Sequence, residues 1–295
     1  MKKNARNKIN EMITQKMVER ISATGTLPWR KPWVSQDARP QNLVSRKPYR
    51  GVNAFLLHMM GYAQPYFLTM KQANQLGGKV LKGEHSMPVV FWKFVEPDET
   101  STDPDKQRGY AMLRYYHVFN VAQCEGIPER KIPKLEKPDR EICPIMEAEQ
   151  LIEDMANKPA IEYGRTYAAY NPLTDTVHMP PQEMFLSDEA FFATCFHEII
   201  HSVGHSSRLA RKGVTDAVRF GSHEYSKEEL VAEMGAAFLC GHCGILPAVE
   251  DNSAAYLNGW LERLKADPSM LVSAGQQAQK AYDYIVAEKL EPVMA

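Results

Sequence analysis

Two histidines four residues apart, with a glutamate directly after the first, constrain the fold of this chain more than any other feature. They are His197 and His201, in the segment His-Glu-Ile-Ile-His, where Glu198 follows the first histidine. In an α-helix, side chains four residues apart lie one above the other on the same face, and both imidazoles can then reach one tetrahedral metal ion. We therefore predict a helix over residues 188–205 with a metal site on one face.

The rest of this segment favours a helix whose opposite face is buried. Ser187, followed by Asp188 and Glu189, is a suitable helix start. Apolar side chains recur on the side away from the histidines, namely Phe192, Cys195 or Phe196, Ile199 and Val203. We therefore expect the histidines to face a cleft and not the core.

Glu198 is placed to assist a metal ion without binding it. At roughly 100° per residue, it lies about 60° from His201 around the helix axis. From there it can take a proton from a metal-bound water and pass it to a leaving amine. This arrangement is typical of zinc metallopeptidases, so the sequence predicts such an enzyme, with Zn²⁺ as the expected ion and Mn²⁺ as the alternative.

The third ligand is expected from a second predicted helix over residues 227–243. A metzincin would have a third histidine where Ser207 stands, so that pattern fails. Glu229 and Glu233 are four residues apart, which is similar to the glutamate-zincins, where an acidic residue four positions after the ligand glutamate orients a histidine. This resemblance assigns Glu229 as the ligand and Glu233 as the orienting carboxylate.

An alternative for Glu229 remains open at this point. The segment from Ser226 to Glu229 also fits a capping box, in which Glu229 would only satisfy the start of the helix. Glu233 would then be the third ligand. Two side chains just before this helix are candidates for stabilising an oxyanion, namely His223 and Tyr225.

Charge is distributed unevenly along the chain. Residues 1–125 contain 19 Lys and Arg against 10 Asp and Glu, a net charge of +9, whereas residues 126–295 contain 16 against 26, a net charge of −10. Such a split indicates a nucleic-acid-binding half, because phosphates are attracted to one half and repelled by the other.

The charge changes sign at a stretch that also predicts a domain boundary. Residues 126–144 contain four prolines and many charges, which favours an extended linker. We therefore predict one domain over residues 1–127, a Pro-rich linker over 128–144 and a second domain over 145–295. Another polar stretch, 96–109, is predicted to be a long mobile loop inside the first domain.

The fold class that follows is α+β, with an N-terminal α+β domain and a mostly helical C-terminal domain. Segments rich in β-branched and aromatic residues predict strands over 87–95 and 110–120. A β-hairpin is expected over 163–179, just before the metal helix. Further helices are predicted around residues 9–21, 53–61, 70–77, 145–157, 252–266 and 270–290.

Aromatic rings alternate with cations in the basic half, which favours single-stranded nucleic acid. Bases stack on the rings while the cations follow the backbone, and no motif that would bind a duplex is present. The candidate DNA-binding residues are Trp29, Arg30, Lys31, Trp33, Arg46, Lys47, Tyr49, Arg50, Asn53, Lys71, Gln72, Lys82, Trp92 and Lys93. In the alternative interpretation, the tryptophans belong to the core and the cations form a solvated face.

The cysteine count and the hydropathy pattern bear on the cellular compartment. Five cysteines in a chain of 295 residues do not form a typical disulfide framework and indicate reduced thiols. No apolar run approaches the ~18 residues of a membrane span, and the first residues lack the apolar stretch of a signal peptide. We therefore expect a cytoplasmic protein without a membrane partner.

Together these segments resemble the ArdC-type antirestriction proteins of conjugative plasmids. PWRKPW, KPYRGVNAFLL, FLTMKQANQLGGKVLKGE and YYHVFNVAQCEGIP resemble the N-terminal domain of that family, which also occurs in some plasmid primases and is associated with single-stranded DNA binding. HEIIHSVGHSSRL and EYSKEELVAEMGAAFL resemble its zincin-like domain. The resemblance implies a protein that protects incoming plasmid DNA from host restriction.

Two functions are compatible with these observations. In the first, a single-strand-binding domain is joined to a metal-dependent peptidase that acts on a restriction-system protein or another peptide. In the second, the DNA-binding half provides antirestriction, and the metal domain is structural or binds a partner without cleaving it. Because the sequence identifies no protein substrate, it slightly favours the second function for antirestriction itself.

Overall fold

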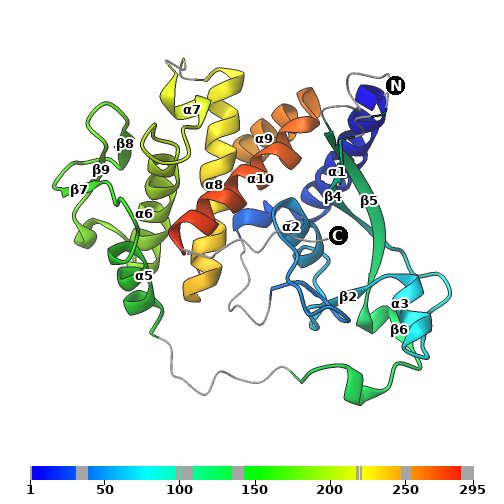
Figure 1. Ribbon diagram of the computed structural model, residues 1–295. Helices are drawn as coiled ribbons and strands as arrows, with labels where there is room; N and C mark the ends of the chain where they lie inside the picture. The colour runs from blue at the N-terminus through cyan, green and yellow to red at the C-terminus, as the bar shows by residue number, and fades with distance from the viewer. Residues whose placement is uncertain are drawn as a thin grey trace.

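The computed structural model describes residues 2–30, 39–97, 100, 109–134, 143–216, 219, 221–246 and 254–286, with side chains from residue 4 onward. The α+β prediction is confirmed, since most strands lie in the N-terminal half and long helices dominate the C-terminal half (Figure 1). Most of the predicted loop over 96–109, the middle of the predicted linker, Lys31 and Trp33 lie outside the described residues.

A four-stranded sheet organises the N-terminal half. Its strand order is β1-β2-β5-β4, with β1 parallel to β2 and the other pairs antiparallel. The two long strands occupy the residues predicted for them, and β3 and β6 form a separate ribbon. The bounds are β1 (Gln41–Asn42), β2 (Tyr66–Leu68), β3 (Lys79–Val80), β4 (Met87–Val95), β5 (Tyr110–Asn120) and β6 (Cys124–Glu125).

The helices of this half begin with α1 (Lys2–Thr24), which is longer than its predicted apolar core over 9–21. Its apolar stripe is buried and consists of Ile9, Ile13, Met17 and Ile21. Thr69 and Gln72 form a capping box at the start of α3. The remaining helices and 3₁₀ turns are η1 (Pro28–Arg30), α2 (Val52–His58), α3 (Met70–Gln75), η3 (Val121–Gln123) and η4 (Glu129–Lys131).

The C-terminal half is built around a central helix, α8, which packs against both α6 and α10. All five predicted helices are present, but α8 begins four residues before residue 227 and α5 ends four residues before residue 157, and α7 was not predicted. Residues 252–253 and 287–290 of the predicted helices lie outside the described residues. The bounds are α5 (Pro144–Glu153), η5 (Gln182–Met184), α6 (Asp188–Val203), α7 (Lys212–Thr215), α8 (His223–Cys243), α9 (Ala254–Ala266) and α10 (Ser269–Ile285).

A small sheet precedes α6, the helix that contains His197 and His201, and its strand order is β7-β9-β8. Strands β8 (Ala169–Asn171) and β9 (Thr176–Met179) form the predicted antiparallel hairpin. Strand β7 (Ala160–Tyr163), which pairs parallel to β9, was not predicted from the sequence. Among the described residues, β8 is therefore an edge strand, and this edge lies beside α6.

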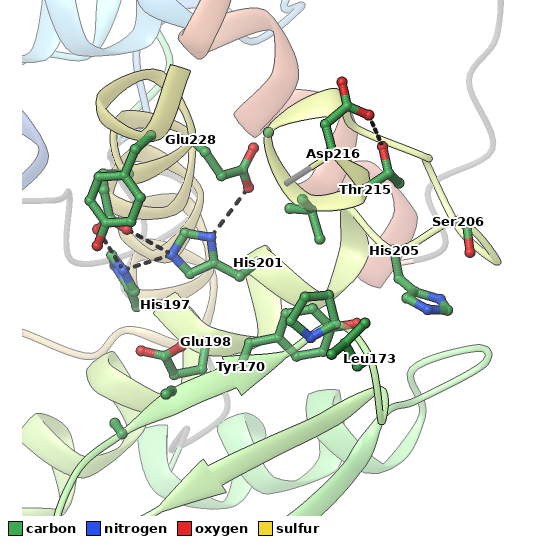
Figure 2. A pocket seen from close by; sticks show the side chains of 17 residues that line it. Tyr170, Leu173, His197, Glu198, His201, His205, Ser206, Thr215, Asp216 and Glu228 are labelled. Atoms are coloured by element: carbon green, nitrogen blue, oxygen red, sulfur yellow. Dashed lines mark hydrogen bonds and ion pairs between the residues drawn. The ribbon is translucent and has the colours of Figure 1, made fainter. Parts of the chain in front are cut away.

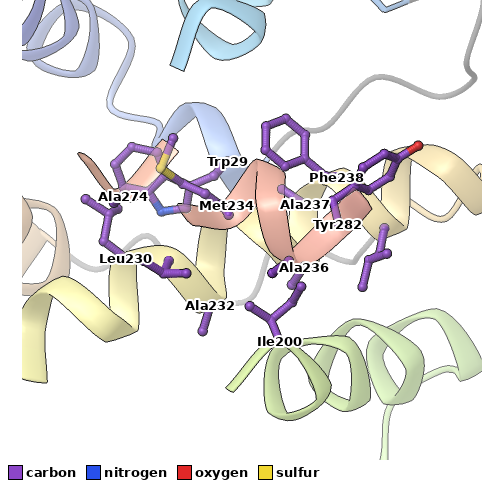
Figure 3. Packing of buried hydrophobic residues seen from close by; sticks show 14 of the residues in the cluster. Trp29, Ile200, Leu230, Ala232, Met234, Ala236, Ala237, Phe238, Ala274 and Tyr282 are labelled. Atoms are coloured by element: carbon purple, nitrogen blue, oxygen red, sulfur yellow. The ribbon is translucent and has the colours of Figure 1, made fainter. Parts of the chain in front are cut away.

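One hydrophobic cluster joins the two halves of the chain. The rings of Phe55 and Phe238 are 4.8 Å apart, and Trp29 meets Trp260 edge-on at 5.9 Å. Figure 3 shows Trp29 close to Met234 of α8 and Ala274 of α10. Helix α10 also approaches α2 closely: a Cβ on Gly275 would lie 2.6 Å from the backbone nitrogen of Val52. Helices α6 and α8 therefore pack on a core to which the N-terminal half contributes.

The described residues contain all five cysteines, and each is a free thiol. Burial raises the pKa of the Cys195 thiol to about 12, with the charge of Glu198 adding to the effect. In the described parts of the chain, no helix combines the length and the hydropathy that crossing a membrane requires.

Candidate metal centre

Helix α6 presents the two predicted histidines one turn apart. The hydroxyl of Ser187 caps the helix by accepting a hydrogen bond from the backbone N–H of Ala190 at 3.3 Å. The apolar face of the helix is buried, as the sequence pattern predicts. On the other face, the Nε2 atoms of His197 and His201 lie 3.1 Å apart, with the two rings nearly perpendicular. Two nitrogen donors therefore converge on one point.

Helix α8 brings a carboxylate to the same point. Glu229 Oε2 lies 3.5 Å from His197 Nε2, and Glu229 Oε1 lies 3.6 Å from His201 Nε2. The two helices can approach this closely because Gly235 has no side chain. A Cβ at Gly235 would lie 2.7 Å from the Cδ1 atom of Ile200 on α6.

The capping-box alternative for Glu229 is wrong, because α8 begins at His223. The residue that caps α8 is Ser222, whose hydroxyl accepts a hydrogen bond from the backbone N–H of Tyr225 at 3.2 Å. Ser226 therefore lies inside the helix, and Glu229 lies in its second turn. The side chain of Glu229 is not needed at the helix start and faces the two histidines.

The separations between these three side chains fit a bound metal ion. A tetrahedral ion with ligands at about 2.05 Å holds its ligand atoms about 3.3 Å apart. One donor atom from each of His197, His201 and Glu229 lies within 4.8 Å of the other two, and the closest separations bracket that value. Two imidazoles and one carboxylate are a donor set that suits zinc and also accepts manganese.

Electrostatics favour an ionised carboxylate at this point. Burial opposes the charge of Glu229, but hydrogen bonds from His197 and Tyr225 and the charge of His201 lower the pKa of Glu229 to about 2. Burial also opposes a charged His197, yet Glu229 and Glu198 raise the pKa of His197 above its ordinary value. The carboxylate of Glu229 is therefore ionised at neutral pH and gives this group of three side chains its negative charge.

Glu228 contacts the outer nitrogen of a histidine, a role that the sequence analysis assigned to Glu233. Glu228 Oε1 lies 3.3 Å from His201 Nδ1 (Figure 2). Arg211 holds the same carboxylate through Nη2 at 2.5 Å and through Nε at 3.1 Å. Burial opposes ionisation of Glu228, but the contacts with His201 and Arg211 lower its pKa. Arg211 therefore contacts Glu228, and Glu228 in turn contacts His201.

Glu233 contacts the N-terminal half of the chain. Its Oε1 accepts hydrogen bonds from Arg30 Nη2 at 3.0 Å and from the Tyr256 hydroxyl at 2.5 Å. The charge of Glu233 still acts on His197 and contributes to the raised pKa of that imidazole. Glu233 therefore does not stand where the sequence predicted it, because it contacts Arg30 and Tyr256, whereas the carboxylate at the outer nitrogen of His201 is that of Glu228.

Glu198 lies beside the histidines, at the wall of a cavity of about 750 Å³. Its side chain is only 9% exposed, and Figure 2 shows it next to His197 on the side of the β8–β9 hairpin. The hydroxyl of Tyr225, which the sequence analysis singled out, also lines the cavity and hydrogen-bonds Glu229. Burial and the neighbouring Glu229 raise the pKa of Tyr225 to about 12, so its hydroxyl keeps its proton.

Two segments form the walls of this cavity. The edge strand β8 and the hairpin tip contribute Ala169, Tyr170 and Leu173, and the segment around α7 contributes residues 213–216. Arg208 forms an ion pair with Asp175 and thereby fixes the hairpin to the end of α6. The cavity is therefore a groove between the edge strand β8 and helices α6 and α8.

Two other histidines near the centre have separate partners. His223 Nε2 lies 3.0 Å from Asp267 Oδ2, and His223 does not line the cavity, so its predicted oxyanion role lacks support. His205 lies at the cavity rim, and its Nδ1 accepts a hydrogen bond from the backbone N–H of Ser207 at 3.2 Å.

In the basic half, two of the predicted stacking rings are buried, which corrects the prediction for them. Trp29 is 2% exposed and packs against Trp260, and Tyr49 is 6% exposed and packs edge-on against Phe67. Their rings therefore offer no face to a nucleic-acid base. For Trp29 the alternative interpretation, that the tryptophans belong to the core, is correct, and Tyr49 belongs to the core as well.

Three predicted cations are engaged with the protein itself. Arg30 pairs with Glu233, and Arg50 pairs with Asp283. Arg46 donates from Nη2 to the carbonyl of Lys131 at 2.9 Å. Arg30 and Arg50 therefore neutralise carboxylates of the acidic half, and these contacts hold the two halves together.

The other predicted DNA-binding residues fall into two groups. Asn53 exchanges two hydrogen bonds with the backbone of Val90, Gln72 completes the cap of α3, and Trp92 is half-buried beneath Arg6. The exposed residues are Lys47, Lys71, Lys82 and Lys93. The first group therefore has a structural role, whereas the four lysines are exposed and accessible to a polyanion.

Two protein families match this chain in sequence. Residues 7–119 match the family described as the N-terminal domain of anti-restriction factor ArdC, and residues 146–277 match the family described as zincin-like metallopeptidase. A protein designated y4eC from Sinorhizobium fredii (strain NBRC 101917 / NGR234) is 33% identical over 95% of this chain and 92% of that protein.

Longer relatives and solved structures are also similar. Two Escherichia coli proteins named DNA primase TraC are 33% and 32% identical over 94% of this chain, which spans only 27% and 20% of their lengths. Crystal structures of the antirestriction ArdC protein from plasmid R388, metal-free and Mn(II)-bound, have a TM-score of 0.70 and 33% identity. They cover 94% of this chain and 96% and 97% of the solved chains.

Proposed function

This chain belongs to the family of ArdC antirestriction proteins, and from that premise we propose that it protects incoming plasmid DNA from host restriction. We propose further that it does so with a single-strand-binding N-terminal half and a peptidase-type metal centre. The observation that supports the second part most directly is the convergence of His197, His201 and Glu229 beside Glu198.

His197, His201 and Glu229 are the proposed ligands of a divalent ion, zinc or manganese. Such an ion, when bound, would act as a Lewis acid toward a carbonyl oxygen and would activate water at neutral pH. The Mn(II)-bound crystal structure of the R388 protein supports a divalent ion in this family. Three protein ligands leave room for water or substrate, which is typical of catalytic and not of structural sites.

Glu198 is the proposed general base and acid. Its carboxylate borders the cavity next to His197, and it can accept a proton from an attacking water and return it to the leaving amine. Tyr225 fixes the carboxylate of Glu229 through its hydroxyl, which keeps its proton and so can donate hydrogen bonds. In this proposal Glu198 transfers the proton, and Tyr225 positions the carboxylate of Glu229; both side chains line the groove.

Arg211 and Glu228 are proposed to orient His201. A liganding histidine commonly donates its second N–H to a carboxylate, which fixes both the tautomer and the ring orientation. Glu228 occupies that position, and the buried guanidinium of Arg211 fixes Glu228 in turn. His201 Nε2 is thereby aimed at His197 and Glu229.

The groove suits an extended peptide better than a nucleic acid. Edge strand β8 lines it, and a peptide could pair with the backbone of that edge. The side chains of Glu198, Glu229 and Asp216 also line the groove, and their charges would repel phosphates. We therefore propose a peptide substrate, such as a segment of a restriction-system protein.

The proposed single-strand binding depends on the positive charge of the N-terminal half. Part of its net charge of +9 is neutralised by the acidic half, but exposed lysines such as Lys47, Lys71 and Lys82 remain. Affinity for single strands should therefore fall steeply as the salt concentration rises. Equal affinity for duplex DNA, or affinity without salt dependence, would contradict this part of the proposal.

Plasmid transfer into a restricting host tests the proposed function. We expect Glu198→Gln to abolish protection and any peptide cleavage while single-strand affinity stays at the wild-type value. The matched control is Glu224→Gln, which changes an exposed glutamate on α8 and should protect fully. Full protection by Glu198→Gln would mean that antirestriction does not use proteolysis, and the metal domain would then be a structural or partner-binding module.

A further inference from the structure

Strands β4 and β5 form a long antiparallel ribbon along one side of the molecule, next to α1 (Figure 1). Side chains alternate between the two faces of such a ribbon, and directly paired residues share a face. Val90, Trp92 and Leu113 lie on the face that belongs to the main core, and Arg6 of α1 covers the ring of Trp92. Helix α1 therefore occupies one face of the ribbon.

The opposite face carries two exposed aromatic rings next to each other. Phe91 is 40% exposed and Tyr116 is 37% exposed, and their ring centroids are 5.6 Å apart. The hydroxyl of Tyr116 is hydrogen-bonded to the buried Tyr49, which fixes the position of the Tyr116 ring. Two adjacent rings thus lie at the protein surface, and covering them with a ligand that excludes water would be favourable.

Two cations share this face with the rings. Arg114 is paired directly opposite Phe91, and Lys93 lies two residues after Phe91 on the same strand. Both side chains are exposed, and neither strand contains Asp or Glu. We call Phe91, Lys93, Arg114 and Tyr116 the ribbon face. Its charge is entirely positive, which complements a polyanion.

We propose that the ribbon face is the surface on which a single-stranded nucleic acid lies, with bases stacked on Phe91 and Tyr116 and phosphates near Lys93 and Arg114. This inference rests on the proposed single-strand binding and deepens it by giving the binding surface. Rings supply stacking that tolerates any base, and neighbouring cations follow the backbone. Trp29 and Tyr49 are buried and cannot stack on bases. The proposed binding surface is therefore the ribbon face and not the segments around Trp29 and Tyr49.

The same strand provides a matched control. Phe94 is 76% exposed, more than Phe91, but it lies on the opposite face with Trp92 and pairs with Ala111. A general effect of an exposed phenylalanine would appear at both positions. An effect of the ribbon face would appear only at Phe91.

Binding of a fluorescent oligothymidine to the full chain tests the proposal. Phe91→Leu keeps an apolar side chain but removes the ring, so affinity should fall about 5- to 100-fold, while Phe94→Leu should stay within about twofold of wild type. The double variant Lys93→Gln/Arg114→Gln should lower the slope of log affinity against log salt by about 1.4, because each single-strand phosphate contact contributes about 0.7. Lys265→Gln/Lys280→Gln, in exposed lysines of the acidic half, should leave the slope unchanged.

The possible outcomes separate this inference from the proposal on which it rests. If wild type binds the strand and the ribbon-face variants bind equally well, single-strand binding stands and the ribbon face is wrong. If wild type binds no single strand, both fail. If the variants instead lose a concentration-dependent dimer in sedimentation while DNA affinity is unchanged, the face is a contact between copies and the proposal is overturned. Unchanged thermal midpoints would show that the variants are folded.

Discussion

Arg30 Nη2 donates a hydrogen bond to Glu233 Oε1 at 3.0 Å, and this contact ties the basic half of the chain to the helix that carries Glu229. Tyr256 completes the contact: its hydroxyl lies 2.5 Å from the same oxygen, and its ring lies under the guanidinium of Arg30. Part of the opposite charge of the two halves therefore stabilises the interface between them through ion pairs, whatever role the remaining charge has toward DNA.

The Arg30–Glu233 contact should contribute to stability as a coupled pair. Arg30→Met and Glu233→Gln should each lower the free energy of unfolding by about 1–3 kcal/mol, because each leaves a partly buried charged group without its partner. The double variant should lose less than the sum of the two, by roughly 1 kcal/mol. Urea denaturation measures all three values.

The control for the comparison of the two single variants with the double variant is an exposed ion pair within one helix. Lys16 and Glu19 on α1 lie 3.2 Å apart with both side chains about half exposed. Lys16→Met and Glu19→Gln should therefore change stability much less than the Arg30 and Glu233 variants do. Additive losses for Arg30 and Glu233 would contradict the proposed coupling across the interface.

Glu228 should determine how tightly the metal is held, although it is not a proposed ligand. Glu228→Gln and Arg211→Met remove the contacts that orient His201, so metal affinity should fall about 10- to 100-fold. Competition with a fluorescent chelator measures this affinity directly, without a substrate. Arg211→Lys keeps the charge and should lose less metal affinity than Arg211→Met. If Glu228→Gln and Arg211→Met both bind the metal as tightly as wild type, the orienting role is excluded.

Metal binding should stabilise the folded chain. With free zinc at 100 times the dissociation constant, the free energy of unfolding should rise by about 2.7 kcal/mol, and excess chelator should reverse the increase. His197→Ala should abolish the shift in thermal midpoint with added zinc. His205→Ala is the matched control, since His205 lies on the same cavity outside the cluster of three and should retain the shift.

Asp267 should make stability depend on pH in the acid range. Burial opposes its charge, but hydrogen bonds from the hydroxyl and the backbone N–H of Ser269, together with Lys227, hold its pKa below the ordinary value. Because the folded-state pKa is the lower one, the carboxylate stabilises the fold above about pH 4. This stabilisation is lost as the pH falls through the folded-state value.

The corresponding measurement compares thermal midpoints of wild type and Asp267→Asn across pH. The variant should melt at a lower temperature at about pH 5.5, and the difference should shrink as the pH falls below about 4. A difference that is constant with pH would show that Asp267 acts through neutral hydrogen bonds alone.

Local patterns in the sequence predicted several elements because the determinants of those elements are local. Strands β4 and β5 occupy the predicted residues, and α6 starts at the predicted cap, Ser187. The start of α8 was misplaced because two serines four residues apart are both plausible caps. Ser222, and not Ser226, accepts the hydrogen bond from the helix backbone.

Contacts between distant segments account for what the sequence could not predict. Arg211 reaches Glu228 from a turn after α6, and no spacing rule links the two. Trp29 is buried because α9 supplies Trp260 against it. A pattern of aromatic residues and cations indicates what a surface could bind, but the packing of other elements decides which of those side chains reach the surface.

The most direct test of the metal centre is a crystal structure of this chain grown with zinc, with anomalous scattering recorded at the zinc edge. We predict one strong peak within about 2.0–2.2 Å of His197 Nε2, His201 Nε2 and a carboxylate oxygen of Glu229. The absence of a peak between these three side chains, or a peak at which Glu228 or Glu233 replaces Glu229, would contradict the account.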